Sequence, residues 1–295
     1  MKEPWSHRFV EANNLRFHCV TQGEGPLVLL LHGFPEFWYS WRHQIPALAG
    51  AGFTVVAPDL RGYNESDKPE DVEAYRISHI VEDVAGLVRA FGRERAVIVG
   101  HDWGGVVAHH FAMRRPEMTR ALVVLNCPHP AAFTAALFGG KNLEQMKKSW
   151  YMFFFQLPEL PEKLLAAENF RLLKAFAYAH ARPGTFRPRD LQAYMEAFAK
   201  PGALTGGINW YRAMFRRSPP PERQFPPIRC PTLVIWGERD HFLGKELTRG
   251  MKRYFSGPFK IRYLPGAGHW VQQEAPGRVN ALLREFLKQI EKRLM

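Results

Sequence analysis

The chain has 295 residues, of which 46% are hydrophobic and 23% are charged. This balance excludes a disordered chain, and the length suits one large α/β domain with an insertion. The formal net charge is +12, but Lys and Arg form no long block and no nucleic-acid-binding motif is present. We therefore expect a solvated basic surface and no nucleic-acid partner. No run of about 18 apolar residues occurs, so no membrane span is predicted.

Continuous apolar runs follow one another in the first half of the chain. They cover residues 26–31, 54–57, 96–99 and 121–125. Runs without polar alternation predict strands that are buried on both faces, as in a parallel sheet covered by helices. Apolar residues at helical spacing over 77–91, followed by Gly92, predict a helix between the second and third strands. This alternation predicts a doubly wound α/β sheet.

The strand pattern stops after Asn126 and resumes near the C-terminus. Residues 128–225 contain helical and aromatic stretches but no buried-strand run. Apolar runs then predict strands at 232–236 and 260–264, and an amphipathic pattern over 278–294 predicts a closing helix.

A helical block that interrupts an α/β pattern predicts a lid inserted into the core domain. The expected division is a first part of the core at 1–129, a helical lid at 130–225 and a second part of the core at 226–295. Three consecutive prolines, Pro219 to Pro221, stand near the end of the lid.

The third predicted strand leads into Gly100-His101-Asp102-Trp103-Gly104-Gly105, which has the pattern of a nucleophile elbow. Such a turn needs small residues around its centre, because any Cβ there would collide across the turn. The glycines meet this need, and Asp102 takes the central position. A carboxylate with a pKa of about 3.9 is already ionised at neutral pH. It can attack an sp3 carbon without a base and form an alkyl ester.

Hydrolysis of that ester requires a base, and the loops after the last two predicted strands supply candidates. Asp240 follows the strand at 232–236, and His269 follows the strand at 260–264. The chain order of nucleophile, acid and His is the α/β-hydrolase order. We expect His269 to activate the water, and Asp240 to hold its tautomer and stabilise the imidazolium.

An oxyanion hole is predicted beside the elbow. The sequence His32-Gly33-Phe34-Pro35 follows the first predicted strand. The backbone N–H groups of Phe34 and Trp103 are expected to point at the Asp102 carboxyl group. Each donor would stabilise the oxyanion of ester hydrolysis by about 3 kcal/mol.

Together these motifs resemble the epoxide hydrolases of the α/β-hydrolase superfamily. The resemblance rests on residues 32–36, on Trp38-Tyr39-Ser40-Trp41-Arg42, on the Asp102 elbow, and on Asp240 with His269. It runs over nearly the whole chain. It implies the α/β-hydrolase fold, with a mostly parallel doubly wound sheet and an inserted helical lid, and it implies no cofactor and no metal.

The same resemblance assigns a role to two lid tyrosines, which in that family donate hydrogen bonds to the epoxide oxygen. Tyr151 lies five residues before the Gln of Gln156-Leu157-Pro158, and Tyr211 lies in Asn209-Trp210-Tyr211-Arg212. The physical need is plain, because an epoxide oxygen leaves as a strongly basic alkoxide. A phenol with a pKa near 10 is protonated at neutral pH and can supply the proton.

The aromatic residues around these motifs predict an apolar substrate pocket. Trp38, Phe155 and Trp210 are expected to line it, and the expected substrates are a small hydrophobic epoxide and water. One residue departs from the family pattern, because Asn64 stands where the family usually has Gly. Asn tolerates a left-handed backbone, so we expect this turn to form.

Other functions stay open at this stage. A haloalkane dehalogenase uses the same Asp-His-Asp triad, but it usually has Asn at the position of Phe34 and lacks the paired tyrosines. A fluoroacetate dehalogenase places Arg directly after the nucleophile, where this chain has Trp103. A binding protein without activity is the third alternative, although every catalytic residue is present.

The three cysteines, Cys19, Cys127 and Cys230, are far apart and odd in number. They predict no disulfide framework, and therefore a reducing, cytoplasmic compartment. The oligomeric state stays open, a homodimer included.

Overall fold

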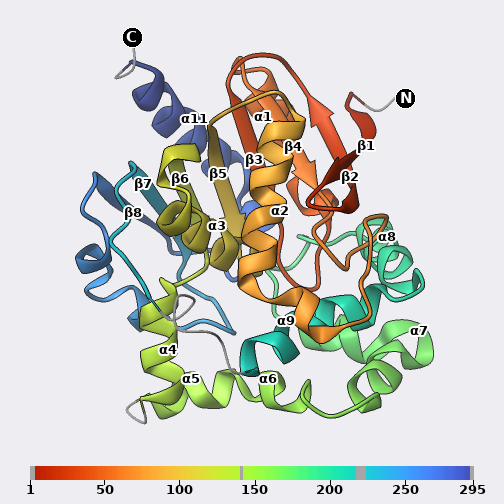
Figure 1. Ribbon diagram of the computed structural model, residues 1–295. Coiled ribbons are helices and arrows are strands. Elements are labelled where there is room, and N and C mark those ends of the chain that lie inside the picture. Colours follow the sequence, from red (N-terminus) through yellow and green to blue (C-terminus); the bar gives the residue numbers. More distant parts are fainter. Residues whose placement is uncertain (1–3, 140–141, 217–223, 293–295) are drawn as a thin grey trace.

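The structure is a computed structural model that describes residues 4–139, 142–216 and 224–292. A twisted sheet runs through the centre of the molecule, helices cover its faces, and a block of helices lies across one end (Figure 1). The eight strands are ordered β1-β2-β4-β3-β5-β6-β7-β8. Their bounds are β1 Ser6–Ala12, β2 Leu15–Gln22, β3 Leu27–Leu31, β4 Thr54–Pro58, β5 Ala96–His101, β6 Thr119–Leu125, β7 Thr232–Gly237 and β8 Phe259–Leu264.

The predicted strands are all present, from β3 to β8, and they pair in parallel. Every residue of β3, β5 and β7 is buried, which explains their continuous apolar sequences. β8 alternates in exposure because it is an edge strand. The prediction of a mostly parallel, doubly wound sheet is therefore confirmed.

An antiparallel hairpin, β1 with β2, extends the sheet at its other edge and was not predicted. β1 is largely exposed, so its sequence lacks the apolar run that marks the central strands. The sequence marks the turn between β1 and β2 by the pair Asn13-Asn14. Both residues have positive φ, 50° and 60°. Two such residues are typical of a tight hairpin turn.

Helices pack on both faces of the sheet. α2 and α3 lie on one face, and α1 and α11 pack together on the other (Figure 1). Gly92 has φ +67° just after α2, as a C-terminal glycine should. The predicted closing helix is α11, although residues 293 and 294 of the prediction lie outside the described residues. The bounds are α1 Gln44–Ala49, α2 Ile77–Ala90, α3 Trp103–Arg114, α10 Val271–Glu274 and α11 Pro276–Lys292.

The block across the carboxyl ends of the strands is a helical cap (Figure 1). Over 130–139 and 142–216, all regular structure is helical. The cap helices are α4 Pro130–Phe138, α5 Leu143–Lys148, α6 Trp150–Phe154, α7 Leu160–Tyr178, α8 Pro188–Ala199 and α9 Ala203–Phe215. Pro219 to Pro221 lie outside the described residues, and the domain boundaries stay a prediction.

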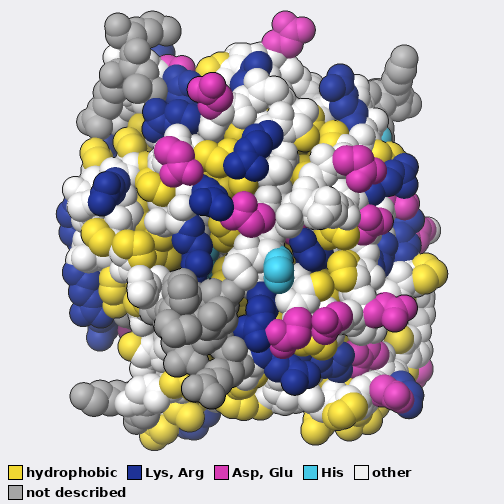
Figure 2. Space-filling model, viewed as in Figure 1, with side chains coloured by type: hydrophobic (Ala, Val, Ile, Leu, Met, Phe, Trp, Pro, Cys, Tyr) yellow, Lys and Arg dark blue, Asp and Glu magenta, His cyan; other side chains and the backbone are white. Residues whose placement is uncertain are grey.

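Short 3-10 helices complete the connections. They cover Trp38–Trp41, Val72–Tyr75, Pro116–Met118, Lys245–Thr248 and Met251–Tyr254. Asn64 has φ +43°, which confirms the expected left-handed turn. On the face that Figure 2 shows, Lys and Arg side chains are scattered among Asp, Glu and apolar side chains. Across the described ranges, no helix is both long and apolar enough to cross a membrane.

Candidate active site

The nucleophile elbow lies between β5 and α3. Asp102 has φ +52° and ψ −121°, a strained conformation for a residue with a side chain. A Cβ on Gly100 would overlap the Gly104 carbonyl oxygen, and a Cβ on Gly104 would overlap the Leu31 carbonyl oxygen. A Cβ on Gly105 would press on the Cys127 side chain. These contacts explain why glycines surround the raised carboxylate.

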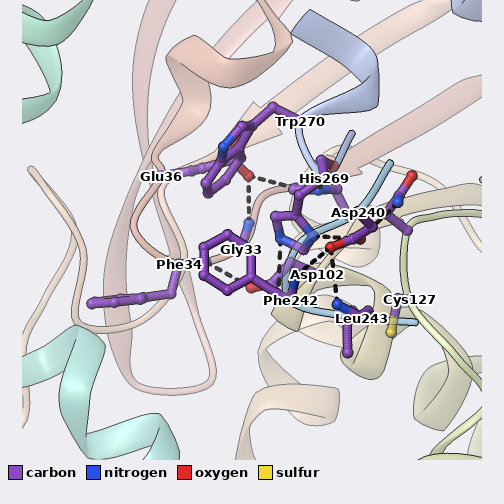
Figure 3. Close-up of polar contacts among 12 residues, drawn as sticks. Gly33, Phe34, Glu36, Asp102, Cys127, Asp240, Phe242, Leu243, His269 and Trp270 are labelled. Atoms are coloured by element: carbon purple, nitrogen blue, oxygen red, sulfur yellow. Dashed lines mark hydrogen bonds and ion pairs between the residues drawn. The ribbon is translucent and has the colours of Figure 1, made fainter. Parts of the chain in front are cut away.

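His269 lies between the two aspartates (Figure 3). Its Nδ1–H donates to Asp240 Oδ2 at 2.8 Å, and its Nε2 lies 3.7 Å from Asp102 Oδ2. Asp240 is held by three further donors: Asn126 Nδ2 at 2.7 Å, Phe242 N at 2.8 Å and Leu243 N at 2.9 Å. The acid of the triad is therefore fully hydrogen-bonded, and the far side of the imidazole is free to face Asp102.

Charge and burial set the protonation of this triad. Burial lowers the pKa of His269, but the charges of Asp240 and Asp102 outweigh burial and raise it to about 9. Burial raises the pKa of Asp102 above its ordinary value, opposed mainly by the charge of His269. Burial also raises the pKa of Asp240, but the His269 charge and hydrogen bond outweigh this and hold it below the ordinary value. These charges favour one another: the two aspartates favour a protonated His269, and His269 favours ionised aspartates.

Two backbone donors face the nucleophile. Phe34 N–H donates to Asp102 Oδ1 at 2.9 Å, and the backbone N–H of Trp103 also stabilises the charged carboxylate. The Phe34-Pro35 peptide bond is cis. The two predicted oxyanion-hole residues thus converge on the Asp102 carboxyl group.

A buried carboxylate, Glu36, lies behind this loop, and no role was predicted for it from the sequence. Glu36 is fully buried and accepts hydrogen bonds from Gly33 N at 3.1 Å and His101 Nδ1 at 2.7 Å. His101 Nε2 in turn contacts the backbone oxygen of His269 at 2.8 Å. Gln272 and Gln273 donate to the other Glu36 oxygen. This network joins the oxyanion loop to the His269 loop. Its sequence signal is that Glu36 directly follows Pro35 and His101 directly precedes Asp102.

The cap places two tyrosines opposite Asp102. Tyr151 in α6 and Tyr211 in α9 are buried, their ring centroids lie 5.8 Å apart, and both line cavities with Asp102. The Tyr211 ring also packs edge-on against Phe34 and Trp103. Burial raises the pKa of both phenols well above 10, and nearby negative charge raises it further. Both hydroxyls therefore stay protonated at neutral pH.

The main cavity next to Asp102 has a volume of about 470 Å³ and is bounded by core and cap. Trp210 lines it. Phe155 was expected to line it but does not, and its ring centroid lies 5.0 Å from that of Tyr211. The expected place of Trp38 needs correction. Its indole packs 5.5 Å from Trp5 near the sheet edge, so it does not line this cavity. Aromatic content alone did not reveal which way each ring points.

Among the described residues, no group of three or more His, Cys, Asp or Glu side chains is arranged to bind a metal ion. A buried carboxylate, an imidazole–carboxylate pair, two backbone donors and two phenols converge on one cavity. Chemically, such a set could supply a nucleophile, a base, an oxyanion hole and proton donors.

Comparison with known proteins agrees with this geometry. Residues 26–276 match the family described as alpha/beta hydrolase fold, and the chain belongs to that family. It is 41% identical to the AB hydrolase superfamily protein YfhM of Bacillus subtilis, over 95% of this chain and 97% of that protein. It is 40% identical to Epoxide hydrolase 4 of Mus musculus, over 96% of this chain and 79% of the mouse protein.

The solved structures point the same way. The epoxide hydrolase of Bacillus megaterium, crystallised with an inhibitor, superposes with a TM-score of 0.85 and 33% identity. The match covers 95% of this chain and 100% of that chain. Within the α/β hydrolases the chain is therefore a member of the epoxide hydrolase family, which confirms the resemblance seen in the sequence.

Proposed function

We propose that the protein hydrolyses hydrophobic epoxides to vicinal diols through a covalent ester on Asp102. One observation carries the proposal: the Asp102 carboxylate shares its cavity with two buried, protonated tyrosines. The names of the relatives support the same activity. A halide leaving group would not need these acids, so the dehalogenase alternative is not favoured.

In the first step, an Asp102 oxygen attacks one carbon of the epoxide ring. The C–O bond to that carbon breaks as the new ester bond forms. The released oxygen takes a proton from Tyr151 or Tyr211, and the second tyrosine stabilises it by a hydrogen bond. The product is a hydroxyalkyl ester, and the phenolate takes up the proton that His269 releases once the Asp102 charge is lost.

In the second step, His269 removes a proton from water, and the resulting hydroxide attacks the ester carbonyl carbon. The oxyanion forms where the N–H groups of Phe34 and Trp103 meet the carboxyl group, each worth about 3 kcal/mol. Its collapse breaks the ester bond, and the leaving oxygen takes the proton of the added hydroxyl group. The diol is released, and Asp102 is again a carboxylate.

The order of these steps explains how a base with a raised pKa can act. His269 has a pKa of about 9 partly because Asp102 is negatively charged. Esterification removes that charge, so the pKa of His269 falls after the first step. The imidazole thus becomes available as a base only when there is an ester to hydrolyse.

We further propose that this enzyme works in the cytoplasm and that residues 130–225 act as its cap. Cys19, Cys127 and Cys230 are free thiols, which supports a reducing compartment. The cap proposal is supported by the tyrosines, which reach the cavity from α6 and α9.

The test compares styrene oxide with 1-bromobutane, measuring diol and bromide. Diol without bromide is the expected result, and bromide without diol would overturn the assignment. The ester is tested by one turnover with excess enzyme in ¹⁸O-labelled water. Diol that carries ordinary oxygen, donated by Asp102, is expected. Diol that carries one ¹⁸O atom would show direct attack by water and refute the ester.

A further inference from the structure

The far end of the catalytic cavity carries a polar side chain that the proposed reaction does not use. α3 contributes Trp103, Val106 and His110 to the cavity wall. Their spacing of three and four residues places them on one face of the helix. His110 stands eight residues after Asp102, which is about 12 Å along the helix axis.

The His110 ring is buried without a hydrogen bond. The residue is only 6% exposed, and its Nδ1 is sealed from solvent with no partner in the described ranges. Its Nε2 is not sealed in this way, and His110 lines the cavity. Nε2 is therefore the ring nitrogen that can meet a ligand.

The protonation of the ring defines what it can bind. Burial, followed by the charge of Arg114, lowers the pKa of His110 to about 3. The ring is neutral at physiological pH and carries one N–H and one lone pair. A sealed N–H without a partner is rarer than a sealed acceptor, so the proton belongs on Nε2. His110 thus offers the cavity a neutral donor.

The surroundings of this donor are apolar. Pro128 and Phe133 line the cavity with His110, and the Phe225 ring centroid lies 5.9 Å from the imidazole. A fixed donor beside apolar side chains orients a ligand and discriminates between ligands that differ in one polar atom.

We propose that His110 forms a distal subsite that selects epoxides with an ether or carbonyl oxygen in their apolar chain. This inference rests on the proposed function and adds a substrate class to it. The attacked carbon lies about 3 Å from the Asp102 carboxylate, and the acceptor oxygen lies about 3 Å from Nε2.

The test uses straight-chain 1,2-epoxides in which an ether oxygen replaces one methylene at successive positions. Diol formation gives kcat/KM for each ether and for its all-methylene analogue. At one position the wild type should prefer the ether about fivefold, as expected for one hydrogen bond of about 1 kcal/mol. His110→Phe should bring this ratio close to one. His110→Gln keeps a donor and should retain part of the preference.

Val106→Ala is the matched control, because it changes the same wall without touching a hydrogen-bonding group; its ratio should follow the wild type. His110→Met is a second, more adaptable replacement should the Phe variant not fold. Wild-type enzyme that forms diols without any ether preference would overturn the subsite alone. An equal ether preference in the Phe or Met variant would do the same. Absence of diol from every substrate would overturn the proposed function as well.

Discussion

Replacing Asp240 by Asn separates the two proposed chemical steps. The Asp240 carboxylate accepts from His269 Nδ1 and from Asn126 Nδ2 through the same oxygen. An amide of the same shape can keep the backbone bonds of Phe242 and Leu243, but its NH₂ group would face donors. To avoid two donors facing each other, His269 must carry its proton on Nε2. In that tautomer Nε2 has no lone pair with which to take a proton from water.

The expected loss of kcat follows from this unfavourable tautomer. The corresponding change in a Ser-His-Asp triad lowers kcat by about 10⁴, which is a barrier increase of about 5 kcal/mol. Ester formation needs only the Asp102 nucleophile and the tyrosines, so it should continue. We therefore expect Asp240→Asn to form the ester and then stop.

The assay combines steady-state diol formation with mass spectrometry of the intact protein. The Asn variant should gain the mass of one substrate molecule while its turnover falls about 10⁴-fold. Glu238→Gln is the matched control, since Glu238 precedes the same loop and its side chain pairs only with Lys245 among the described residues. This control should turn over normally and carry no adduct.

Two results would refute the reasoning. Turnover of Asp240→Asn within tenfold of the wild type would show that Asp240 does not orient His269. A strong loss of turnover without an adduct would show that Asp240 acts before the ester forms, or that no ester forms.

Three further predictions follow from the same structure. The Tyr151→Phe, Tyr211→Phe double variant should slow single-turnover ester formation about 10²–10⁴-fold. Unchanged rates would show that the two rings only pack in the core of the cap. Hydrolysis of the preformed ester should accelerate with rising pH, because His269 must be neutral to act as a base. The midpoint of this pH profile should lie below pH 9, because the Asp102 charge that helps raise the pKa of His269 to about 9 is absent in the ester. A midpoint above pH 9 would contradict the proposed loss of that charge. Gly104→Ala should lower the free energy of unfolding, measured in urea, by about 3 kcal/mol, because the new Cβ overlaps the backbone of β3. Gly277 has open space around it, so Gly277→Ala should change this free energy by less than about 1 kcal/mol. Equal effects of the two substitutions would refute the steric explanation.

Local sequence patterns predicted much of this protein because the physics behind them is local. A strand buried on both faces must be apolar throughout, which made β3 to β7 visible. A sharp turn between strand and helix tolerates only glycine at Gly100 and Gly104, which exposed Asp102 as its centre. The order of Asp240 and His269 after successive strands followed from the same pattern, because parallel strands end at one edge of the sheet.

Tertiary structure decided what depends on packing between distant segments. The β1–β2 hairpin gains its place by pairing with β4, which no local apolar run predicts. Trp38 and Trp210 look alike in sequence, but only Trp210 lies at the cavity, because side-chain direction depends on how the cap packs on the core. The partners of Glu36 and the unpaired ring of His110 are also set by residues far away in the chain. The sequence by itself determined which groups can react, and the fold determined which of them meet.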